Sequence, residues 1–227
     1  MTKSAIIIGA SRGLGLGLAT EHAARGWQVI ATARGDAPDL AAAIAASGGR
    51  ITLAHVDIDD ADSVAALVAA LGEARFDLIF VNAGVTGPGH ASAAKASAEE
   101  IGALMMTNAT APIRIAERLL PRLNDGGTLA FMSSILGSVG LNTGGGYDLY
   151  RASKAALNTL TRSLAARLKD RPVSILSLHP GWVRTAMGGP SADIDVETSV
   201  RGLADVIAAN TAPGHRYLDY KGDTLPW

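Results

Sequence analysis

A tyrosine and a lysine stand four residues apart in the run Tyr150-Arg151-Ala152-Ser153-Lys154. If this run is helical, the phenol and the ammonium project from one face. A phenol with a pKa of about 10 is a poor base at neutral pH, but a neighbouring cation stabilises the phenolate and lowers that pKa. The spacing alone occurs by chance in many helices. In a suitable context, the pair predicts proton exchange with a carbonyl or alcohol oxygen.

Two other groups compete for this role. Tyr147 and Arg151 have the same spacing, but arginine stays charged and is less suited to proton transfer. Residues 141–146 are rich in glycine, so we expect Tyr147 in a loop ahead of the helix, where it lines a substrate pocket. A histidine at a buried strand end, such as His179, is more often a structural hydrogen-bonding group. No second metal ligand stands near it, so the predicted site contains neither His179 nor a metal.

Glycine accounts for 26 of the 227 residues, well above the average of about 7 %. Three glycines fall in residues 9–15, between a short apolar run and a helical pattern. Such a turn lets the backbone approach a pyrophosphate while a helix N-terminus faces its charge. The usual G-x-G-x-x-G is not present, because Leu18 stands where a third glycine or alanine would sit, and an ordinary glycine-rich turn stays the alternative. The predicted phosphate-binding residues are Gly9, Ser11, Arg12, Gly13, Leu14 and Gly15.

The end of the second predicted strand bears on the choice of dinucleotide. A carboxylate there holds the ribose 2′-hydroxyl of NAD, whereas an arginine accommodates the phosphate of NADP. Here Arg34 follows the strand, Arg12 supplies a second guanidinium, and the first acid is Asp36. Two guanidiniums can chelate a 2′-phosphate, so NADP(H) is favoured over NAD(H). Alternatively, both arginines are solvated loop residues and Asp36 reaches a ribose.

Short apolar runs alternate with longer helical segments along the chain. The expected strands are 4–8, 28–32, 51–56, 78–82, 128–133 and 173–179, with a short last one near 216–218. The expected helices are 14–25, 38–46, 61–71, 98–123, 150–169 and 196–209. This order predicts an α/β fold: a Rossmann-type, doubly wound parallel sheet of about seven strands with helices on both faces. We expect a single dinucleotide-binding and catalytic domain over residues 1–227, with ligands at the carboxyl ends of the strands.

Charge and cysteine content exclude several classes of protein. The chain has 20 Lys+Arg and 21 Asp+Glu, which gives no support to nucleic-acid or anionic-membrane binding. It has no cysteine, which excludes a disulfide framework, a thiolate metal site and a cysteine nucleophile together. The N-terminal residues lack the pattern of a secretion signal, and no run approaches the ~20 apolar residues of a membrane span. We therefore expect a cytoplasmic protein that binds neither nucleic acid nor membrane.

The G-x-x-x-G-x-G loop after the first strand and the Tyr-x-x-x-Lys pair resemble the short-chain dehydrogenase/reductase family. The resemblance runs in the family's order from residue 9 to residue 185. Runs similar to its C-factor and carbonyl-reductase-like branch are 133–134, 144–147, 150–154, 179–185, 187–189 and 220–227. The family implies hydride transfer between a nicotinamide and a small carbonyl or alcohol, with Tyr150 as general acid/base and Lys154 lowering its pKa. It implies neither the substrate nor the direction.

The same resemblance assigns two more catalytic residues. Ser134 opens an S-x-x-G run and corresponds to the serine whose hydroxyl holds the substrate oxygen, with Ser133 as the neighbour to test. The stretch from Ser134 to Tyr150 is longer than in many relatives. Asn108 matches the asparagine that in relatives holds a water linking the lysine to solvent. Alternatively, Asn108 relieves the backbone hydrogen bond that Pro112, four residues later, cannot make.

Further cofactor contacts are implied at the ends of later strands. An aspartate lies beside the adenine in relatives and an N-N-A-G motif lies beneath it, although this chain has Val81 in place of the first asparagine. Taken alone, Asp57 is more typical of a helix cap. A Pro-Gly pair followed by a threonine embraces the nicotinamide. The implied cofactor-binding residues are Asp57, Ile58, Asn82, Ala83, Gly84, Tyr150, Lys154, Pro180, Gly181, Val183 and Thr185.

The family resemblance also leads to expectations about the oligomeric state and about the lid over the substrate site. Small residues on the helix that carries the tyrosine, such as Ala152 and Thr159, would let another helix approach, and this surface faces either the sheet or a second subunit. Relatives often dimerise through this helix and the one before it, so a homodimer or homotetramer is expected. Only about a dozen residues separate Thr185 from the last long helix, so the lid is short and the pocket is open or completed by a partner. The alternative to an enzyme is a dinucleotide-binding regulatory or signalling protein on the same fold.

Overall fold

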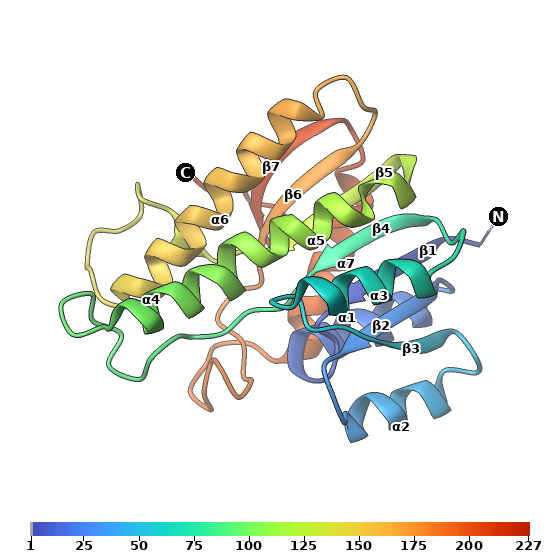
Figure 1. Ribbon diagram of the computed structural model, residues 1–227, viewed down its shortest axis with the longest axis horizontal. Coiled ribbons are helices and arrows are strands. Elements are labelled where there is room, and N and C mark those ends of the chain that lie inside the picture. Colours follow the sequence, from blue (N-terminus) through green and yellow to red (C-terminus); the bar gives the residue numbers. More distant parts are fainter. Residues whose placement is uncertain (1) are drawn as a thin grey trace.

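The structure, a computed structural model, describes residues 2–227, and its seven β-strands lie side by side in one sheet (Figure 1). The strands are β1 (Ser4–Ile8), β2 (Gln28–Ala33), β3 (Ile51–His55), β4 (Phe76–Val81), β5 (Leu123–Met132), β6 (Ser174–His179) and β7 (Gly214–Asp219). Their order is β3-β2-β1-β4-β5-β6-β7, and each neighbouring pair is parallel. The doubly wound sheet predicted from the sequence is confirmed.

Helices cover both faces of this sheet. They are α1 (Gly13–Ala24), α2 (Pro38–Ala46), α3 (Ala61–Ala70), α4 (Ala98–Met105), α5 (Ala111–Leu119), α6 (Asp148–Arg167) and α7 (Val196–Ala209). Apolar side chains of α3, α5 and α6 pack on one face, and those of α1, α2 and α7 pack on the other. Figure 1 shows α5 and α6 next to each other in front of the strands.

Strand β1 shows why the strands are apolar throughout. Side chains of a strand point alternately to its two faces. Ile6 and Ile8 belong to the buried cluster beneath α3 and α5, whereas Ile7 belongs to the cluster beneath α1 and α7. Both faces of β1 therefore exclude water, as is typical of a parallel sheet between two helical layers.

The order of the strands positions the functional loops. β1 pairs with β2 on one side and with β4 on the other, so the chain changes direction across the sheet at this point. The carboxyl ends of β1 and β4 meet there: the backbone N–H of Asn82, just after β4, donates to the carbonyl of Ile8 over 3.0 Å. In sheets of this type, the crevice at such a point is where ligands bind.

The prediction of one helix over residues 98–123 is wrong in its interior. A π turn, Met106–Thr110, separates α4 from α5. Pro112 lies in the first turn of α5. It has no N–H to donate to the carbonyl of Asn108 four residues earlier, and its ring crowds that carbonyl, which favours the wider turn. The interruption places the buried Asn108 inside the π turn.

The same prediction is wrong at its end. Pro121 lies in a short 3-10 turn, Leu120–Arg122, and Leu123 belongs to β5, where it pairs with Phe76 of β4. The other boundaries differ from the predictions by a few residues. The largest difference is at β5, which begins at Leu123 where the sequence predicted 128, because the register between β4 and β5 shifts after Phe76.

Two negative findings apply to the chain from residue 2 to residue 227. None of its helices combines the length and the apolarity that crossing a bilayer requires. Within the same range, no three His, Cys, Asp or Glu side chains gather where they could hold a metal ion.

Candidate active site

The glycine loop after β1 is shaped by close approach of backbone atoms. A Cβ on Gly15 would lie 2.0 Å from the carbonyl oxygen of Gly9 and 2.6 Å from Nδ2 of Asn82, so a larger residue does not fit there. Gly9 and Gly13 adopt φ values of +86° and +55°, in the region that glycine tolerates best. The side chain of Asn82 donates a 2.7 Å hydrogen bond to the carbonyl of Gly9, which joins the end of β4 to the loop.

The loop ends in the N-terminus of α1, which is suited to an anion. Arg12 is the N-cap residue and makes no capping hydrogen bond through its side chain, and the first turn contains no acidic residue. A Cβ on Gly13 would lie 3.7 Å from Cγ2 of Thr185, so the loops after β1 and β6 face each other across this N-terminus. Bare backbone and a helix N-terminus without a side-chain cap fit a pyrophosphate.

Two arginines and one aspartate lie on the side of the site where a ribose 2′-group is expected. Arg12, Arg34 and Asp36 are all exposed. In the described part of the chain, neither guanidinium takes part in an ion pair, so both are available to a phosphate. The structure keeps both alternatives open, a chelated 2′-phosphate and a ribose held by Asp36.

Asp57 does not cap the following helix, and that alternative is wrong. The N-cap of α3 is Asp60, whose side chain accepts a hydrogen bond from the N–H of Asp62. The carboxylate of Asp57 accepts from the N–H of Asp59 over 3.1 Å in a tight turn directly after β3. Ile58 beside it is buried. A role next to the adenine stays a prediction for both residues.

Lys154 is buried at the centre of the candidate site. Only 3 % of it is exposed, and its Nζ donates a 2.9 Å hydrogen bond to the carbonyl of Met132 at the end of β5. Burial lowers the pKa of Lys154 from 10.5 to about 8, because removal from water disfavours the charged form. The ammonium lies 5.7 Å from the centre of the Tyr150 ring. Both side chains come from the first two turns of α6, as their spacing predicted.

The Tyr150 phenol does not show the lowered pKa that the sequence led us to expect from Lys154. Burial raises its pKa from 10 to about 12 and so favours the protonated form, and an interaction with the side chain of Ser134 works in the opposite direction. The phenol and the Ser134 hydroxyl are therefore neighbours. Together they offer two hydroxyl groups that a single carbonyl oxygen can contact.

The two serines after β5 have different surroundings. The hydroxyl of Ser133 is buried and donates a 2.7 Å hydrogen bond to Oδ1 of Asn158 on α6. The hydroxyl of Ser134 accepts from the N–H of Leu136 over 3.1 Å and lies beside Tyr150. This geometry favours Ser134 as the group that meets a substrate, and Ser133 as a link between β5 and α6.

Asn108 lies beside Lys154, and its side chain forms hydrogen bonds with residues outside its own helix. Its Oδ1 accepts from the N–H of Val85 over 2.8 Å, and its Nδ2 donates to the carbonyl of Val85 and to the hydroxyl of Ser153. A Cβ on Gly84 would lie 3.2 Å from Oδ1 of Asn108 and 3.4 Å from Nζ of Lys154. The Asn108 side chain thus bonds to a loop and to α6, which does not match the alternative of relieving the bond that Pro112 cannot make.

The rival pair, Tyr147 and Arg151, lies where the glycine-rich loop meets α6. Tyr147 is 64 % exposed, with a φ of +54°, and stands directly before α6, as expected for a loop residue. The guanidinium of Arg151 donates to the carbonyls of Gly146 and Gly145. It therefore fastens the glycine-rich loop to the helix and is not directed at a phenol.

The segment after β6 closes on itself within about a dozen residues. Val183 forms a β-bridge with Ile194, and α7 begins at Val196. The hydroxyl of Thr185 accepts from the N–H of Gly188 over 3.0 Å. The cover over this side of the site is therefore short, in agreement with the expectation from the sequence.

His179, at the end of β6, does not act as the hydrogen-bonding group that its position suggested. Its Nδ1 is buried without a hydrogen-bond partner among residues 2–227. Burial lowers the pKa of His179 to about 4, so the ring is neutral. It remains outside the candidate site.

One residue of this region carried no signal in the sequence. Tyr217 of β7 is 1 % exposed, and its hydroxyl donates to the carbonyl of Ser134. The two residues are far apart in the chain, and no motif or spacing connects them. Only the neighbouring positions of β5, β6 and β7 in the sheet bring them together.

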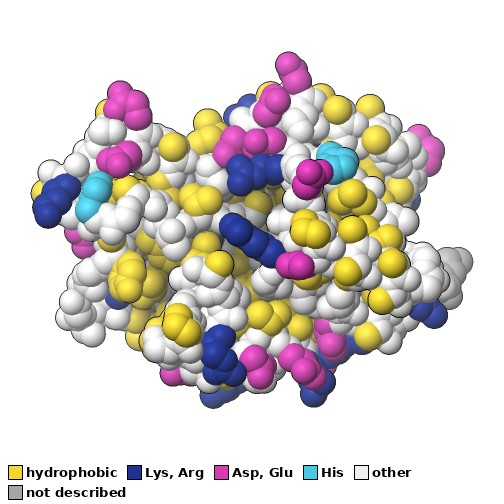
Figure 2. Space-filling model, turned by 90° about the horizontal axis from the view of Figure 1, so that it is seen from below, with side chains coloured by type: hydrophobic (Ala, Val, Ile, Leu, Met, Phe, Trp, Pro, Cys, Tyr) yellow, Lys and Arg dark blue, Asp and Glu magenta, His cyan; other side chains and the backbone are white. Residues whose placement is uncertain are grey.

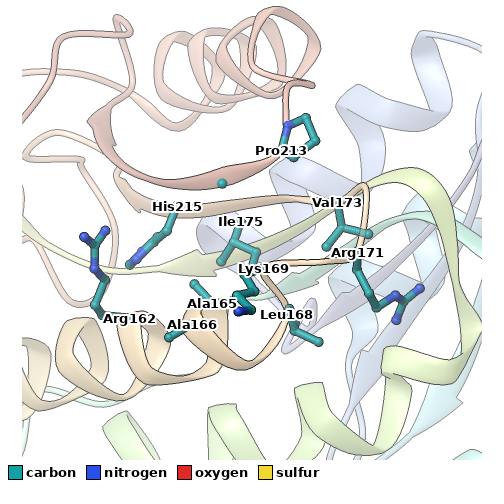
Figure 3. A pocket seen from close by; sticks show the side chains of 11 residues that line it. Arg162, Ala165, Ala166, Leu168, Lys169, Arg171, Val173, Ile175, Pro213 and His215 are labelled. Carbon is teal, nitrogen blue, oxygen red and sulfur yellow. The ribbon is translucent and has the colours of Figure 1, made fainter.

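A cavity of about 360 Å³ lies away from all these groups (Figure 3). It opens between the end of α6 and the beginnings of β6 and β7, where Arg162, Val173 and His215 contribute to its wall. The candidate site lies at the carboxyl ends of the strands instead. A second cavity, of about 270 Å³, lies beside the loop between Ser134 and Tyr150.

The surface drawn in Figure 2 carries a mixture of side chains. Lys and Arg side chains lie among Asp and Glu side chains, and apolar groups lie between them. This mixture on one face accompanies a net charge of −1 for the whole chain. A nucleic-acid interface would instead gather basic residues into a patch.

Known proteins are similar to this chain in sequence and in fold. A family model described as short chain dehydrogenase matches residues 3–194. The "C-signal" of Myxococcus xanthus is 38 % identical over 154 residues, which cover 66 % of this chain and 92 % of that protein. A 1-hydroxy-2-glutathionyl-2-methyl-3-butene dehydrogenase from Rhodococcus sp. (strain AD45) is 32 % identical, with 98 % of each chain covered. The crystal structure of a carbonyl reductase from Pseudomonas aeruginosa PAO1 in complex with NADP superposes with a TM-score of 0.94, at 42 % identity and full coverage of both chains.

Proposed function

Since this chain belongs to the short-chain dehydrogenase/reductase family of oxidoreductases, we propose that it transfers a hydride between NADP(H) and a small carbonyl or alcohol substrate. One observation carries the proposal. Two hydroxyls, those of Tyr150 and Ser134, lie together beside the buried ammonium of Lys154, at the edge of the sheet that also holds the glycine loop. When bound there, the nicotinamide cofactor supplies or accepts the hydride, and the residues of the chain manage the proton.

The two hydroxyls have different roles toward the substrate oxygen. Ser134 orients this oxygen with a hydrogen bond, and Tyr150 exchanges a proton with it. With a pKa of about 12, the Tyr150 phenol is a proton donor at neutral pH, which suits reduction of a carbonyl. Lys154 holds a positive charge next to the phenol in a site of low dielectric and so stabilises the phenolate that remains after donation.

Asn108 completes the arrangement by connecting the lysine to solvent. It lies beside Lys154 across Gly84, which has no side chain to separate them. Its amide is held by Val85 and Ser153, so its orientation is fixed. We assign to Asn108 the role of holding a water that returns protons to Lys154, as the family resemblance implies.

NADP(H) is the cofactor that these residues favour. The glycine loop and the N-terminus of α1 fit the pyrophosphate. Arg12 and Arg34, which form no ion pair among residues 2–227, fit a 2′-phosphate. The carbonyl reductase from Pseudomonas aeruginosa PAO1 was solved in complex with NADP. The ratio of kcat/KM for NADPH and NADH measures the preference, and a higher value for NADH would contradict it.

A panel of aldehydes, ketones and alcohols tests the activity, with the absorbance of the reduced cofactor as the signal. We expect turnover of at least one class of carbonyl with NADPH. Tyr150→Phe removes only the phenolic hydroxyl, so NADPH binding should persist while kcat falls by a factor of about 10³ or more. If the variant kept the wild-type kcat, Tyr150 would not be the acid/base.

A second candidate function has one specific observation in its favour. The relative from Myxococcus xanthus is named "C-signal", which suggests a regulatory role for a dinucleotide-binding protein of this type. The Tyr150→Phe variant separates the two functions. A cellular phenotype that survives this substitution would favour the binding protein, and one that is lost with turnover would favour the enzyme.

We also propose a homodimer or homotetramer assembled through α6. Ala152 and Thr159 are exposed on this helix, and the neighbouring loop residue Val139 is 75 % exposed. A mass in solution equal to the 23.2 kDa of one chain would contradict this assembly. The cytoplasmic location stays a prediction from the sequence.

A further inference from the structure

The backbone carbonyl of Ser134 accepts two hydrogen bonds. One comes from the N–H of Gly137 over 2.8 Å and closes the turn after β5. The other comes from the hydroxyl of Tyr217 on β7, which lies two strands away from β5 in the sheet. Both acceptor positions of this carbonyl are thus occupied, and the peptide unit that carries the Ser134 side chain is held from two sides.

The Tyr217 hydroxyl also meets the two side chains that connect β5 to α6. It interacts with the side chains of Asn158 and Ser133, which are joined by their own 2.7 Å hydrogen bond. The amide of Asn158 reaches the carbonyl of Gly137 over 3.5 Å. These contacts connect β7, α6 and the end of β5 to the turn that begins at Ser134.

The same turn rests on the helix that carries the other catalytic residues. A Cβ on Gly137 would lie 2.9 Å from the backbone carbon of Lys154, so the turn and α6 are in close contact. A shift of the turn therefore changes the position of Ser134 relative to Lys154 and Tyr150. The Tyr217 hydroxyl joins β7 to this arrangement.

The end of the chain covers Tyr217. The Trp227 ring stacks on the Tyr217 ring with a centroid distance of 5.1 Å and an interplanar angle of 27°. The N–H of Leu225 donates to the Tyr217 carbonyl over 2.9 Å, and the N–H of Gly140 donates to the Trp227 carbonyl over 3.1 Å. His215, which also lines the cavity of Figure 3, lies 4.8 Å from the Trp227 ring. Tyr217 is fixed by these contacts and cannot turn away from Ser134 without breaking them.

We propose that Tyr217 is a positioning residue for the reaction: its hydroxyl holds the backbone of Ser134 so that the serine hydroxyl meets the substrate oxygen beside Tyr150. This inference rests on the proposed function. A phenylalanine would fill the same space without a polar atom, and a buried hydroxyl lowers stability unless it is hydrogen-bonded. Burial raises the pKa of Tyr217 to about 12, so its hydroxyl remains a donor at all working pH values.

Tyr217→Phe tests the inference, with Ser174→Ala as the matched control. Ser174 is fully buried, and its hydroxyl donates to the carbonyl of Asn210 over 2.6 Å, so each variant removes a hydrogen bond from a buried side chain to the backbone. With NADPH and benzaldehyde, or the best carbonyl of the panel, we expect kcat of Tyr217→Phe to fall about tenfold while KM for NADPH changes less than about twofold. Ser174→Ala should lower the melting temperature to a similar extent and leave kcat unchanged. An unchanged kcat for Tyr217→Phe, or an equal loss in both variants, would overturn the inference.

Amide hydrogen exchange tests whether Tyr217 holds the turn without depending on the proposed enzymatic activity. Exchange at residues 135–140 should be faster in Tyr217→Phe than in the wild type, and unchanged in Ser174→Ala. If no carbonyl is turned over by the wild type, the proposed function fails, and exchange alone decides whether Tyr217 holds the turn. If Tyr150→Phe abolishes turnover while Tyr217→Phe changes neither kcat nor exchange, the function stands and this inference fails.

Discussion

The ammonium of Lys154 donates a hydrogen bond to the carbonyl of Met132 while the side chain is almost completely removed from water. Burial lowers the pKa of Lys154 from 10.5 to about 8. This difference corresponds to about 3 kcal/mol of lost stability below pH 8, where the lysine is charged in both the folded and the unfolded chain. The proposed catalytic role of Lys154 therefore has a cost in stability.

Replacing Lys154 with methionine should separate activity from stability. Methionine has a similar length and no charge, so we expect kcat at neutral pH to fall by a factor of about 10² or more. The wild type should gain stability relative to the variant as the pH rises from 8 towards 10.5, because in this window the unfolded chain binds a proton that the folded chain has lost. Melting temperatures of both proteins across this range measure the effect. A difference between them that stayed constant with pH would refute the argument.

Ser134 and Ser133 should respond differently to replacement by alanine. Ser134→Ala removes the hydroxyl beside Tyr150, and we expect kcat to fall by a factor of about 10² with little change in melting temperature. Ser133→Ala leaves the buried Oδ1 of Asn158 without its donor, so unfolding should cost about 1 to 3 kcal/mol less while kcat falls less than in the other variant. The two variants, measured side by side with NADPH, decide the assignment; the opposite order of kcat values would make Ser133 the substrate residue.

Gly15→Ala should weaken cofactor binding, because the added Cβ would lie 2.0 Å from the backbone oxygen of Gly9 and the loop would have to move. We expect the Kd for NADPH to rise by a factor of about 10². Gly102→Ala is the matched control: no atom lies within 4 Å of the added methyl, and the residue is inside α4. That variant should bind NADPH normally and be more stable by up to about 1 kcal/mol. Normal NADPH binding by Gly15→Ala in a calorimetric titration would show that the loop is not the phosphate site.

The two directions of the reaction should depend differently on pH. The Tyr150 phenol has a pKa of about 12 in the free protein, so the protonated form that a carbonyl reduction needs is present throughout the neutral range. We expect kcat/KM for the reduction to be nearly constant between about pH 6 and about pH 7, where Lys154 keeps its charge. We expect kcat/KM for alcohol oxidation to rise with pH from about 6 towards about 8, where Lys154 begins to lose its charge. Initial rates in both directions measure this. A rate of oxidation that falls with rising pH would contradict the role of Tyr150.

The sequence predicted those features that depend on local pattern. Apolar runs and glycines place β1, the loop at residues 9–15 and α1, and the four-residue spacing places Tyr150 and Lys154 on one helix. The π turn around Asn108 was missed, because a helical pattern continues through it and only the proline at 112 indicates a disturbance. Tyr217 was missed for another reason: its partner Ser134 is 83 residues away, and only the order of strands in the sheet makes them neighbours.

The π turn between α4 and α5 has a consequence for the evolution of this chain. Each residue of an α-helix advances the side chains by about 100° around the axis. A deletion of one residue between Met106 and Thr110 would therefore rotate the apolar face of α5 away from the sheet, or the Asn108 amide away from Val85 and Ser153. Substitutions in this segment change one side chain at a time, but a change of length alters the direction of a whole helix. The number of residues here should be more strictly maintained than most of their identities.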